Sequence, residues 1–131
     1  LNGAGGDILE LVRAFFEKKT TEAEQRGVNK NRLCFDPGIG FGKTNEENFA
    51  LIANPEKIRV PGTALLMAAS RKRVIGAVCG NPPFEDRMAG TVAAHTASVL
   101  FGADMVRAHD TFEAVQAARV ADAIKQFRKG V

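Results

Sequence analysis

The sequence contains no tryptophan and no tyrosine, and it has only two cysteines among its 131 residues. Its net charge of +3 is small, and its basic residues alternate with acidic ones except in the run at 71–73. Nucleic-acid-binding surfaces usually combine a broad basic stripe with stacking aromatics, so we expect no nucleic-acid partner. No apolar run approaches the length that spans a bilayer, and no charged and then apolar leader opens the chain. We therefore predict a cytoplasmic protein with no membrane partner.

Cys34 and Cys79 lie far apart in the sequence, each among apolar neighbours and without a spacing typical of metal ligands. We therefore predict two buried, reduced thiols and no metal ligand from this chain. The remaining composition, with 45% hydrophobic and 25% charged residues, is that of one ordinary globular domain.

The pattern of apolar residues predicts a helix followed by three strand–helix units. From Ile8 to Phe16 apolar residues recur at helical spacing, and Gly27 is a natural end for that helix. Short apolar runs predict strands at 32–35, 64–69 and 103–107. Helices are predicted at about 46–53, near 71, at about 85–101 and from 111, where Thr111 can act as the cap.

Short apolar strands that are each followed by a helix are typical of a parallel sheet covered by helices. Three such strands would leave two apolar edges unpaired, which makes a poor free-standing domain. The chain also opens on a helix that no strand precedes. We therefore predict an α/β fold, the C-terminal part of a (β/α)8 TIM barrel, with three βα units, a preceding helix and about half of the barrel absent. The alternative is a complete flavodoxin-like fold, although that fold normally starts on a strand.

Polar side chains follow each of the three predicted strands. Asp36 follows the first strand, Ser70–Lys72 follow the second, and Arg107 and His109 end the third. Because residues two apart on a strand point the same way, Arg107 and His109 should emerge side by side. The three endings recur at intervals of about 35 residues, which suits one strand–helix unit each. Ligands bind at the carboxyl ends of parallel strands, so we predict one polar site on one rim.

The segment at 36–43 reads Asp-Pro-Gly-Ile-Gly-Phe-Gly-Lys, which is too rich in glycine to be regular. It lacks the spacing of a nucleotide P-loop, so we do not expect it to cradle a nucleotide. An ionised carboxylate at Asp36 could accept two parallel N–H groups from the amide or amino edge of a ligand. The alternative is that Asp36 closes the turn through backbone N–H groups.

Ser70, Arg71 and Lys72 fall at the predicted start of a helix, where cations oppose the helix dipole. Such an unfavourable placement of cations at a strand end indicates a functional role. Backbone N–H groups at the helix start, together with the Ser70 hydroxyl and Lys72, predict an anion site. The alternative is a solvated basic turn.

His95 lies on an apolar helical stripe with Met88, Val92 and Val99. We therefore expect its side chain to be buried in helix packing or at an interface rather than to act in catalysis. The residues around it are small, which permits close helix approach and suits a subunit contact; they are Ala89, Gly90, Ala93, Ala94 and Ala97.

Three segments together resemble the dihydropteroate synthase family. Residues 36–43 are similar to its D-P-G-[FI]-G-F-G-K loop, residues 70–72 to its S-R-K signature and residues 107–110 to its R-x-H-D ending. The order and intervals agree as well. The resemblance implies that residues 1–131 are the C-terminal portion of a single pterin-binding barrel domain, in a cytoplasmic transferase of folate biosynthesis.

The family joins 6-hydroxymethyl-7,8-dihydropterin pyrophosphate to p-aminobenzoate with Mg²⁺ present, and sulfonamides inhibit it. The resemblance implies that Asp36 binds the guanidine-like edge of the pterin, Lys72 its ring carbonyl and nitrogen, and Ser70 the aminobenzoate carboxylate. Arg107 and His109 would grip the pyrophosphate. The implied catalytic residues are Lys72, Arg107 and His109. The implied substrate-binding residues are these three together with Asp36, Gly40, Phe41, Ser70 and Arg71. Within this set, Phe41 would form an apolar wall and Arg71 would serve structurally.

The family's Mg²⁺ ligand and further pterin contacts come from strands that would precede Leu1. We therefore expect Mg²⁺ to be held by that missing half, and this chain to be inactive alone. The C-terminal helices imply a homodimer. Two alternatives stay open: a methyltetrahydrofolate-binding methyltransferase domain, which needs no site for an aminobenzoate carboxylate or a pyrophosphate, and a non-catalytic pterin-binding or dimer-forming fragment.

Overall fold

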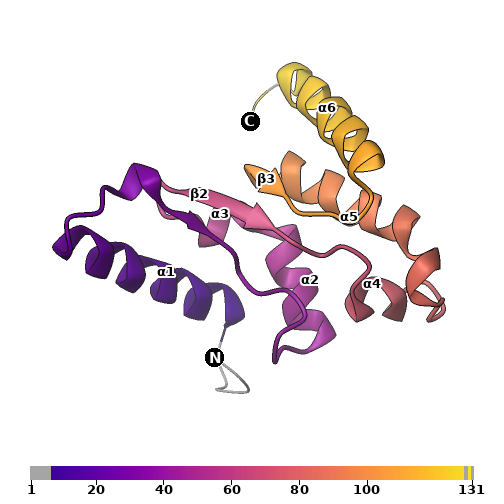
Figure 1. Cartoon of the computed structure of the whole chain (residues 1–131), viewed down its shortest axis with the longest axis horizontal. Helices are drawn as coiled ribbons and strands as arrows, with labels where there is room; N and C mark the ends of the chain where they lie inside the picture. The colour runs from indigo at the N-terminus through magenta and orange to yellow at the C-terminus, as the bar shows by residue number, and fades with distance from the viewer. Residues whose placement is uncertain (1–6, 129, 131) are drawn as a thin grey trace.

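The computed structural model describes residues 7–128 and residue 130. Its helices and strands alternate along the chain, as Figure 1 shows. The elements are α1 (Ile8–Gln25), η1 (Lys30–Arg32), β1 (Cys34–Phe35), α2 (Asn45–Ala53), α3 (Pro55–Ile58), β2 (Ala64–Met67), α4 (Arg73–Ala77), η2 (Phe84–Asp86), α5 (Met88–Leu100), β3 (Met105–Val106) and α6 (Thr111–Phe127).

The three strands form one parallel sheet in the order β1-β2-β3. The central strand pairs Ala64 with Cys34 on one side and Leu66 with Met105 on the other. The predicted parallel sheet is therefore confirmed. The strands are shorter than the apolar runs, because residues 30–32 form a 3-10 turn before β1 and residues 68–69 leave the sheet after β2.

The two faces of the sheet have different environments. Leu65 and Met67 are at most 1% exposed and face the helices, with Phe35 and Val106 of the neighbouring strands packed against the same core. Side chains alternate along a strand, so Leu66 and Met105, which pair in register, belong to the opposite face. Within the described residues no helix covers that face, and Met105 is exposed. The sheet is thus covered by helices on one face only.

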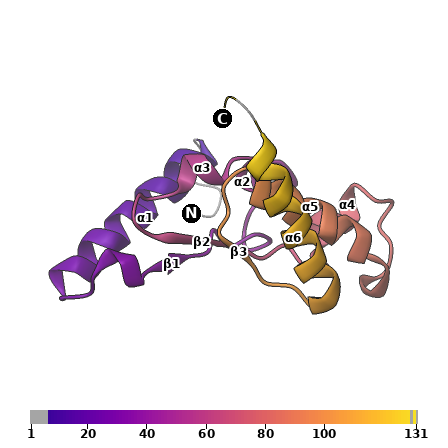
Figure 2. The same ribbon diagram turned by 90° about the horizontal axis from the view of Figure 1, so that it is seen from above.

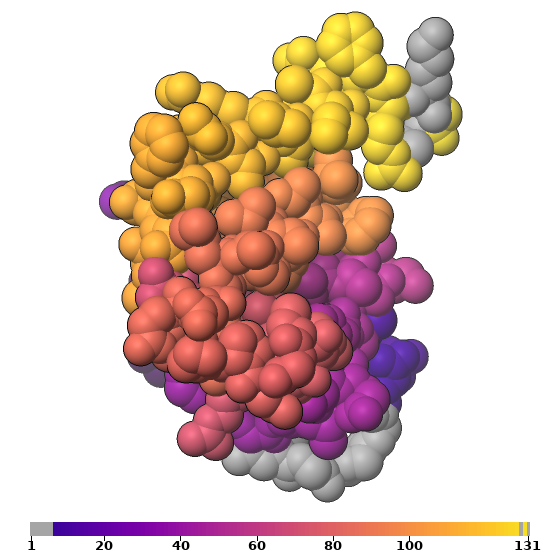
Figure 3. Space-filling model, turned by 90° about the vertical axis from the view of Figure 1, so that its right-hand side faces the viewer, coloured from indigo at the N-terminus to yellow at the C-terminus, as the bar shows by residue number. Residues whose placement is uncertain are grey.

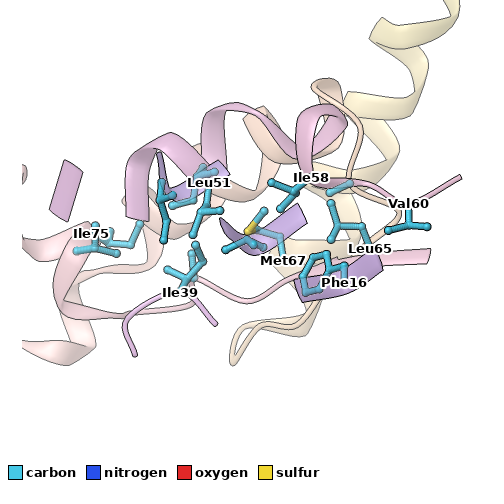
Figure 4. Packing of buried hydrophobic residues seen from close by; sticks show 14 residues of the cluster. Phe16, Ile39, Leu51, Ile58, Val60, Leu65, Met67 and Ile75 are labelled. Atoms are coloured by element: carbon cyan, nitrogen blue, oxygen red, sulfur yellow. The ribbon is translucent and has the colours of Figure 1, made fainter. Parts of the chain in front are cut away.

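The core lies between the covered face of the sheet and helices α1 to α4 (Figure 4). The apolar stripe of α1 provides Ile8, Val12 and Phe16, as its helical spacing predicts. The Phe16 ring stacks on Phe35 of β1 with centroids 4.6 Å apart. Further fully buried side chains come from the loop and helices between the first two strands; they are Ile39, Leu51 and Ile58.

Helices α1 and α6 lie at opposite ends of the sheet, as Figures 1 and 2 show from two directions. The last helix packs mainly against α5 and extends beyond the body of the molecule (Figure 3). Only Ala121 of α6 is fully buried, while large apolar side chains of this helix remain exposed; they are Phe112, Val115, Val120, Ile124 and Phe127.

Two predicted helix starts are shifted by two or three residues, and one predicted cap was wrong. The helix placed near residue 71 begins at Arg73, with Lys72 as its N-cap, and has only five residues. The helix placed from residue 85 begins at Met88 after a separate 3-10 turn. Thr111 is the first residue of α6 rather than its cap, and the N-cap Asp110 makes no capping hydrogen bond because its carboxylate binds Arg71.

The prediction of buried thiols was also wrong, since Cys34 and Cys79 are both exposed. Cys34 lies at the edge strand on the uncovered face, with its Sγ 3.8 Å from Sδ of Met105. An apolar neighbourhood in sequence therefore did not mean burial, because the face that carries Cys34 has no covering layer. None of the described helices is long and apolar enough to cross a membrane.

Candidate active site at the strand ends

The carboxyl ends of the last two strands enclose a pocket of about 330 Å³. Because all three strands run parallel, the residues that follow them meet at one rim. The pocket is lined by Ala68, Ser70, Lys72, Arg107, Ala108 and His109. Asp36, after β1, lies beside it, with its Oδ2 4.0 Å from Nη2 of Arg107. The structure therefore brings the residues that follow all three strands together at one rim.

Ser70 and His109 join the ends of β2 and β3 through two hydrogen bonds. The backbone N–H of His109 donates to Oγ of Ser70 at 3.0 Å, and the same Oγ lies 2.7 Å from Nδ1 of the imidazole. When the Ser70 hydroxyl donates to Nδ1, the neutral ring carries its proton on Nε2. The ring edge is also held by Phe84, whose centroid is 5.3 Å away in a T-shaped contact. Nε2 is then a fixed donor for an anionic ligand.

The two oxygens of Asp36 are in different situations: one closes the turn, as the alternative interpretation predicted, and the other is not used by the turn. Its Oδ1 accepts the backbone N–H of Gly38 at 2.8 Å, which closes the turn. Among the described residues its Oδ2 contacts Arg107 alone, at 4.0 Å, and the carboxylate remains accessible. One oxygen therefore stabilises the loop while the other is available to a ligand donor.

Lys72 connects the β2 end with the glycine-rich loop. Its ammonium donates to the carbonyl of Ile39 and lies 4.9 Å from the ring centroid of Phe41. Burial lowers the pKa of Lys72, an effect that Asp36 opposes and the charge of Arg107 reinforces. Gly40 leaves room for this side chain, since a Cβ there would lie 3.2 Å from Cδ of Lys72.

A second pocket, of about 500 Å³, lies on the loop side of Lys72. Its walls include Gly40, Phe41, Lys43 and Asn48. Asn48 is buried, and its Oδ1 accepts the backbone N–H of Gly40 at 2.9 Å, which fixes the loop. The ammonium of Lys43 donates to the carbonyls of Gly38 and Phe41, and burial lowers its pKa. Lys72 thus separates a pocket lined by basic and polar side chains from one with an aromatic wall.

Arg71 is held by a bidentate ion pair rather than directed at the pocket. Its Nη2 and Nε lie 2.6 Å and 3.1 Å from the two oxygens of Asp110, and this pairing lowers the pKa of the carboxyl. The Arg71 backbone has φ of 55°, a left-handed conformation that only a well-anchored non-glycine residue adopts. This geometry agrees with the structural role that the sequence suggested.

Two backbone N–H groups of the predicted anion site, those of Arg71 and Lys72, already donate hydrogen bonds within the protein. The N–H of Arg71 donates to Oγ1 of Thr91 at 2.9 Å, and the N–H of Lys72 donates to the carbonyl of Ala69 at 3.2 Å. The five-residue α4 also provides a short dipole. The groups that border the 330 Å³ pocket are therefore side chains, those of Ser70, Lys72, Arg107 and His109, rather than these two amides.

The sequence did not reveal several residues that hold the site. Asn48, Thr91 and His95 each accept one backbone N–H of a rim loop, and all three are buried. His95 is buried in helix packing as predicted. Its hydrogen bond to Ala69 was not predicted, because a partner 26 residues away has no local sequence signal.

The described residues contain no group of three or more His, Cys, Asp or Glu side chains arranged to hold a metal ion. Asp36 lies beside the pocket, and one of its oxygens is already bonded to the loop.

Comparison with known proteins adds a family and a set of relatives. A family model described as "Pterin binding enzyme" matches residues 2–109. The dihydropteroate synthase of Clostridium beijerinckii is 42% identical over 119 residues, covering 90% of this chain and 44% of that protein. That of Synechocystis is 37% identical, covering 91% of this chain and 41% of that protein. The chain thus spans less than half the length of these curated relatives.

Solved structures agree with the computed fold. A Xanthomonas albilineans dihydropteroate synthase with 4-aminobenzoic acid matches with a TM-score of 0.89 and 35% identity, covering 97% of this chain and 48% of that one. A Burkholderia cenocepacia dihydropteroate synthase complexed with 7,8-dihydropteroate matches with a TM-score of 0.88 and 35% identity, covering 96% and 47%. The described sheet and helices therefore correspond to about half of a barrel of this kind.

Proposed function

Because the chain belongs to the pterin binding enzyme family, we propose that it supplies the C-terminal part of a dihydropteroate synthase. The reaction would form a C–N bond between the amine of p-aminobenzoate and the methylene carbon of 6-hydroxymethyl-7,8-dihydropterin pyrophosphate. The C–O bond to pyrophosphate breaks, and the amine loses a proton. The observation that carries this proposal is the convergence of Asp36, Lys72 and Arg107 with the Ser70–His109 pair at one rim.

The leaving pyrophosphate needs positive charge and fixed donors as the C–O bond breaks. Arg107 and the Nε2 of His109 border the 330 Å³ pocket and are suited to that task, with the ammonium of Lys72 on its other side. The exposed Arg107 guanidinium is free to reorient toward a polyphosphate. We assign the pyrophosphate to this pocket.

The pterin and the aminobenzoate would lie on the two sides of Lys72. The accessible oxygen of Asp36 suits the amino and ring N–H groups of a pterin, because a carboxylate accepts parallel donors. Phe41, which is 68% exposed, offers an apolar wall to an aromatic ring in the 500 Å³ pocket, and Gly40 keeps the passage beside Lys72 open. Ser70 borders the 330 Å³ pocket rather than this one, and both of its bonds go to His109, so it would hold the aminobenzoate carboxylate only where the substrate reaches past Lys72 and replaces one of those bonds.

Mg²⁺ belongs to the same proposal, as the counterion of the pyrophosphate. The resemblance to dihydropteroate synthases implies that its protein ligand lies on strands outside this chain. When bound, the ion would offset charge on the leaving group. Arg107 and His109 would do the same from this chain.

A homodimer and a cytoplasmic location also remain proposals. An apolar pocket on the outer side of α2, α4 and α5 is bordered by Phe49, Ala93, Ala97 and Phe101, small and aromatic side chains that suit a subunit contact. Sedimentation of the complete protein, with Ala93→Glu as the disrupting variant, tests the dimer.

The assay that tests the function uses the longest natural polypeptide containing these residues, with pterin pyrophosphate, p-aminobenzoate and Mg²⁺. We expect pyrophosphate release that depends on both substrates and is inhibited competitively by a sulfonamide. Arg107→Ala should lower kcat/KM by about a hundred-fold or more. Turnover of methyltetrahydrofolate with no sulfonamide effect would instead support the methyltransferase alternative.

A further inference from the structure

His95 is a buried titratable residue that the proposed reaction does not use. Its side chain is 3% exposed, and its Nε2 accepts the backbone N–H of Ala69 at 3.0 Å. A nitrogen that accepts a hydrogen bond carries no proton, so the ring is neutral with its hydrogen on Nδ1. His95 therefore fixes the backbone at the point where β2 ends.

Thr91 makes a matching contact one helical turn earlier on α5. Its Oγ1 accepts the backbone N–H of Arg71 at 2.9 Å and donates its own hydrogen to the carbonyl of Arg87 at 2.7 Å. Residues four apart lie on the same face of a helix, so His95 and Thr91 reach the same loop. Their two backbone partners, Ala69 and Arg71, are the immediate neighbours of Ser70.

The loop needs such anchors because its conformation is unfavourable on its own. Arg71 has φ of 55°, and strain of this kind persists only where surrounding contacts over-determine it. Arg87 completes the anchoring, since its Nη1 donates to the carbonyl of Arg71 at 3.0 Å. Rotation of the peptides on either side of Ser70 would move its Oγ away from His109 and redirect Lys72.

We infer that His95 and Thr91 are positioning residues of the site: from α5 they hold Ser70 and Lys72 in place by accepting the backbone N–H groups of Ala69 and Arg71. Neither residue borders either pocket of the site. The inference deepens the proposed function and rests on it where binding is measured. A purely apolar packing role for His95 would need no acceptor at Nε2.

The test compares three variants of the complete protein. His95→Leu keeps an apolar side chain but removes the acceptor, and His95→Gln returns an amide oxygen near the position of Nε2. Val99→Ala is the control, because Val99 is buried on the same helix and its side chain has no hydrogen-bonding group. The first measurement is calorimetric binding of inorganic pyrophosphate with Mg²⁺ at pH 7.5. The second is hydrogen exchange of the Ala69 and Arg71 amides.

We expect His95→Leu to weaken pyrophosphate binding about ten-fold and to speed exchange at Ala69, because its N–H loses its acceptor. His95→Gln should restore both, and Val99→Ala should change neither although it lowers stability. If His95→Leu binds pyrophosphate as tightly as the wild-type protein, and its Ala69 amide exchanges at the wild-type rate, the inference is overturned. If the wild-type protein neither binds pyrophosphate nor forms product, the proposed function fails. In that case, slow exchange of the Ala69 amide in His95→Gln but not in His95→Leu still supports the role of residue 95 in positioning the strand end.

Discussion

The hydroxyl of Ser70 lies 2.7 Å from Nδ1 of His109 and accepts the backbone N–H of the same residue at 3.0 Å. Two strand ends that are 39 residues apart in sequence are thus joined through one side-chain oxygen. This contact fixes which nitrogen of His109 is free, and therefore where a ligand oxygen can bind.

Ser70→Ala removes both bonds and leaves the His109 N–H without its partner. We expect a loss of about 1–3 kcal/mol in the free energy of unfolding and about ten-fold weaker pyrophosphate binding. Denaturant unfolding and calorimetry measure the two effects. Ser98→Ala is the control, since Ser98 is a buried serine of α5 whose hydroxyl donates to the carbonyl of Ala94 at 2.9 Å and to that of Ile52 at 3.5 Å, and it borders neither pocket of the site. Equal binding losses in both variants would contradict the role of Ser70.

Gly40→Ala should disturb Lys72 as well as the backbone. Gly40 has φ of 86°, and the added Cβ would lie 3.2 Å from Cδ of Lys72. Gly27 offers a matched control, because its φ is 84° but no atom lies within 4 Å of its Cβ position. Both variants should lose about 1–2 kcal/mol of stability to the left-handed conformation. Only Gly40→Ala should lower kcat/KM of the complete protein, by about ten-fold or more, and equal activities would refute this.

The stability of the protein should fall between about pH 6.5 and pH 4 because of His95. Burial, and to a lesser degree the charge of Lys72, lower its pKa from 6.5 to about 4. The unfolded chain takes up a proton in this window that the folded chain does not, so unfolding becomes easier as the pH falls. The full decrease in the free energy of unfolding is about 3 kcal/mol. Urea unfolding at stepped pH measures it, and the same slope in His95→Gln would contradict this assignment.

At lower pH the carboxylate of Asp110 should affect the stability of the protein. The hydrogen bonds from Arg71 hold the pKa of Asp110 below its usual value of 3.8. The ion pair therefore stabilises the folded state above that pH, and its contribution is lost as the pH falls through the lowered pKa. The difference in stability between the wild-type protein and Asp110→Asn should shrink below about pH 3.8. A difference that stays constant down to pH 2 would count against the pair.

The uncovered face of the sheet should make the 131-residue chain associate with itself. Leu66 is a half-buried side chain of this face, whereas Leu65 points into the core and is 1% exposed. Leu66→Lys should therefore reduce association, measured by light scattering, and leave the chain folded by circular dichroism. Leu65→Lys should unfold it, because a charge would be buried without a partner. A monomeric wild-type chain would contradict the expectation.

Local sequence patterns predicted the order of elements, the parallel sheet and the shared rim. The helical stripe of α1 and the burial of His95 followed from spacing alone. The left-handed turn at Arg71 and the bond from Ala69 to His95 could not be predicted, because both depend on α5, some 20 or more residues along the chain. The exposure of Cys34 was missed for a similar reason, since it depends on what packs against the sheet.

Adjacent residues of β2 are constrained by different parts of the molecule. Leu65 and Met67 contact the helices of this chain, while Ala64 and Leu66 face the side that the described residues leave uncovered. A screen that selects variants of the 131-residue chain for thermal stability would consequently tolerate many changes at Ala64 and Leu66. The complete protein is expected to reject some of the same changes wherever other strands pack on that side, so the two screens would rank neighbouring positions in opposite orders.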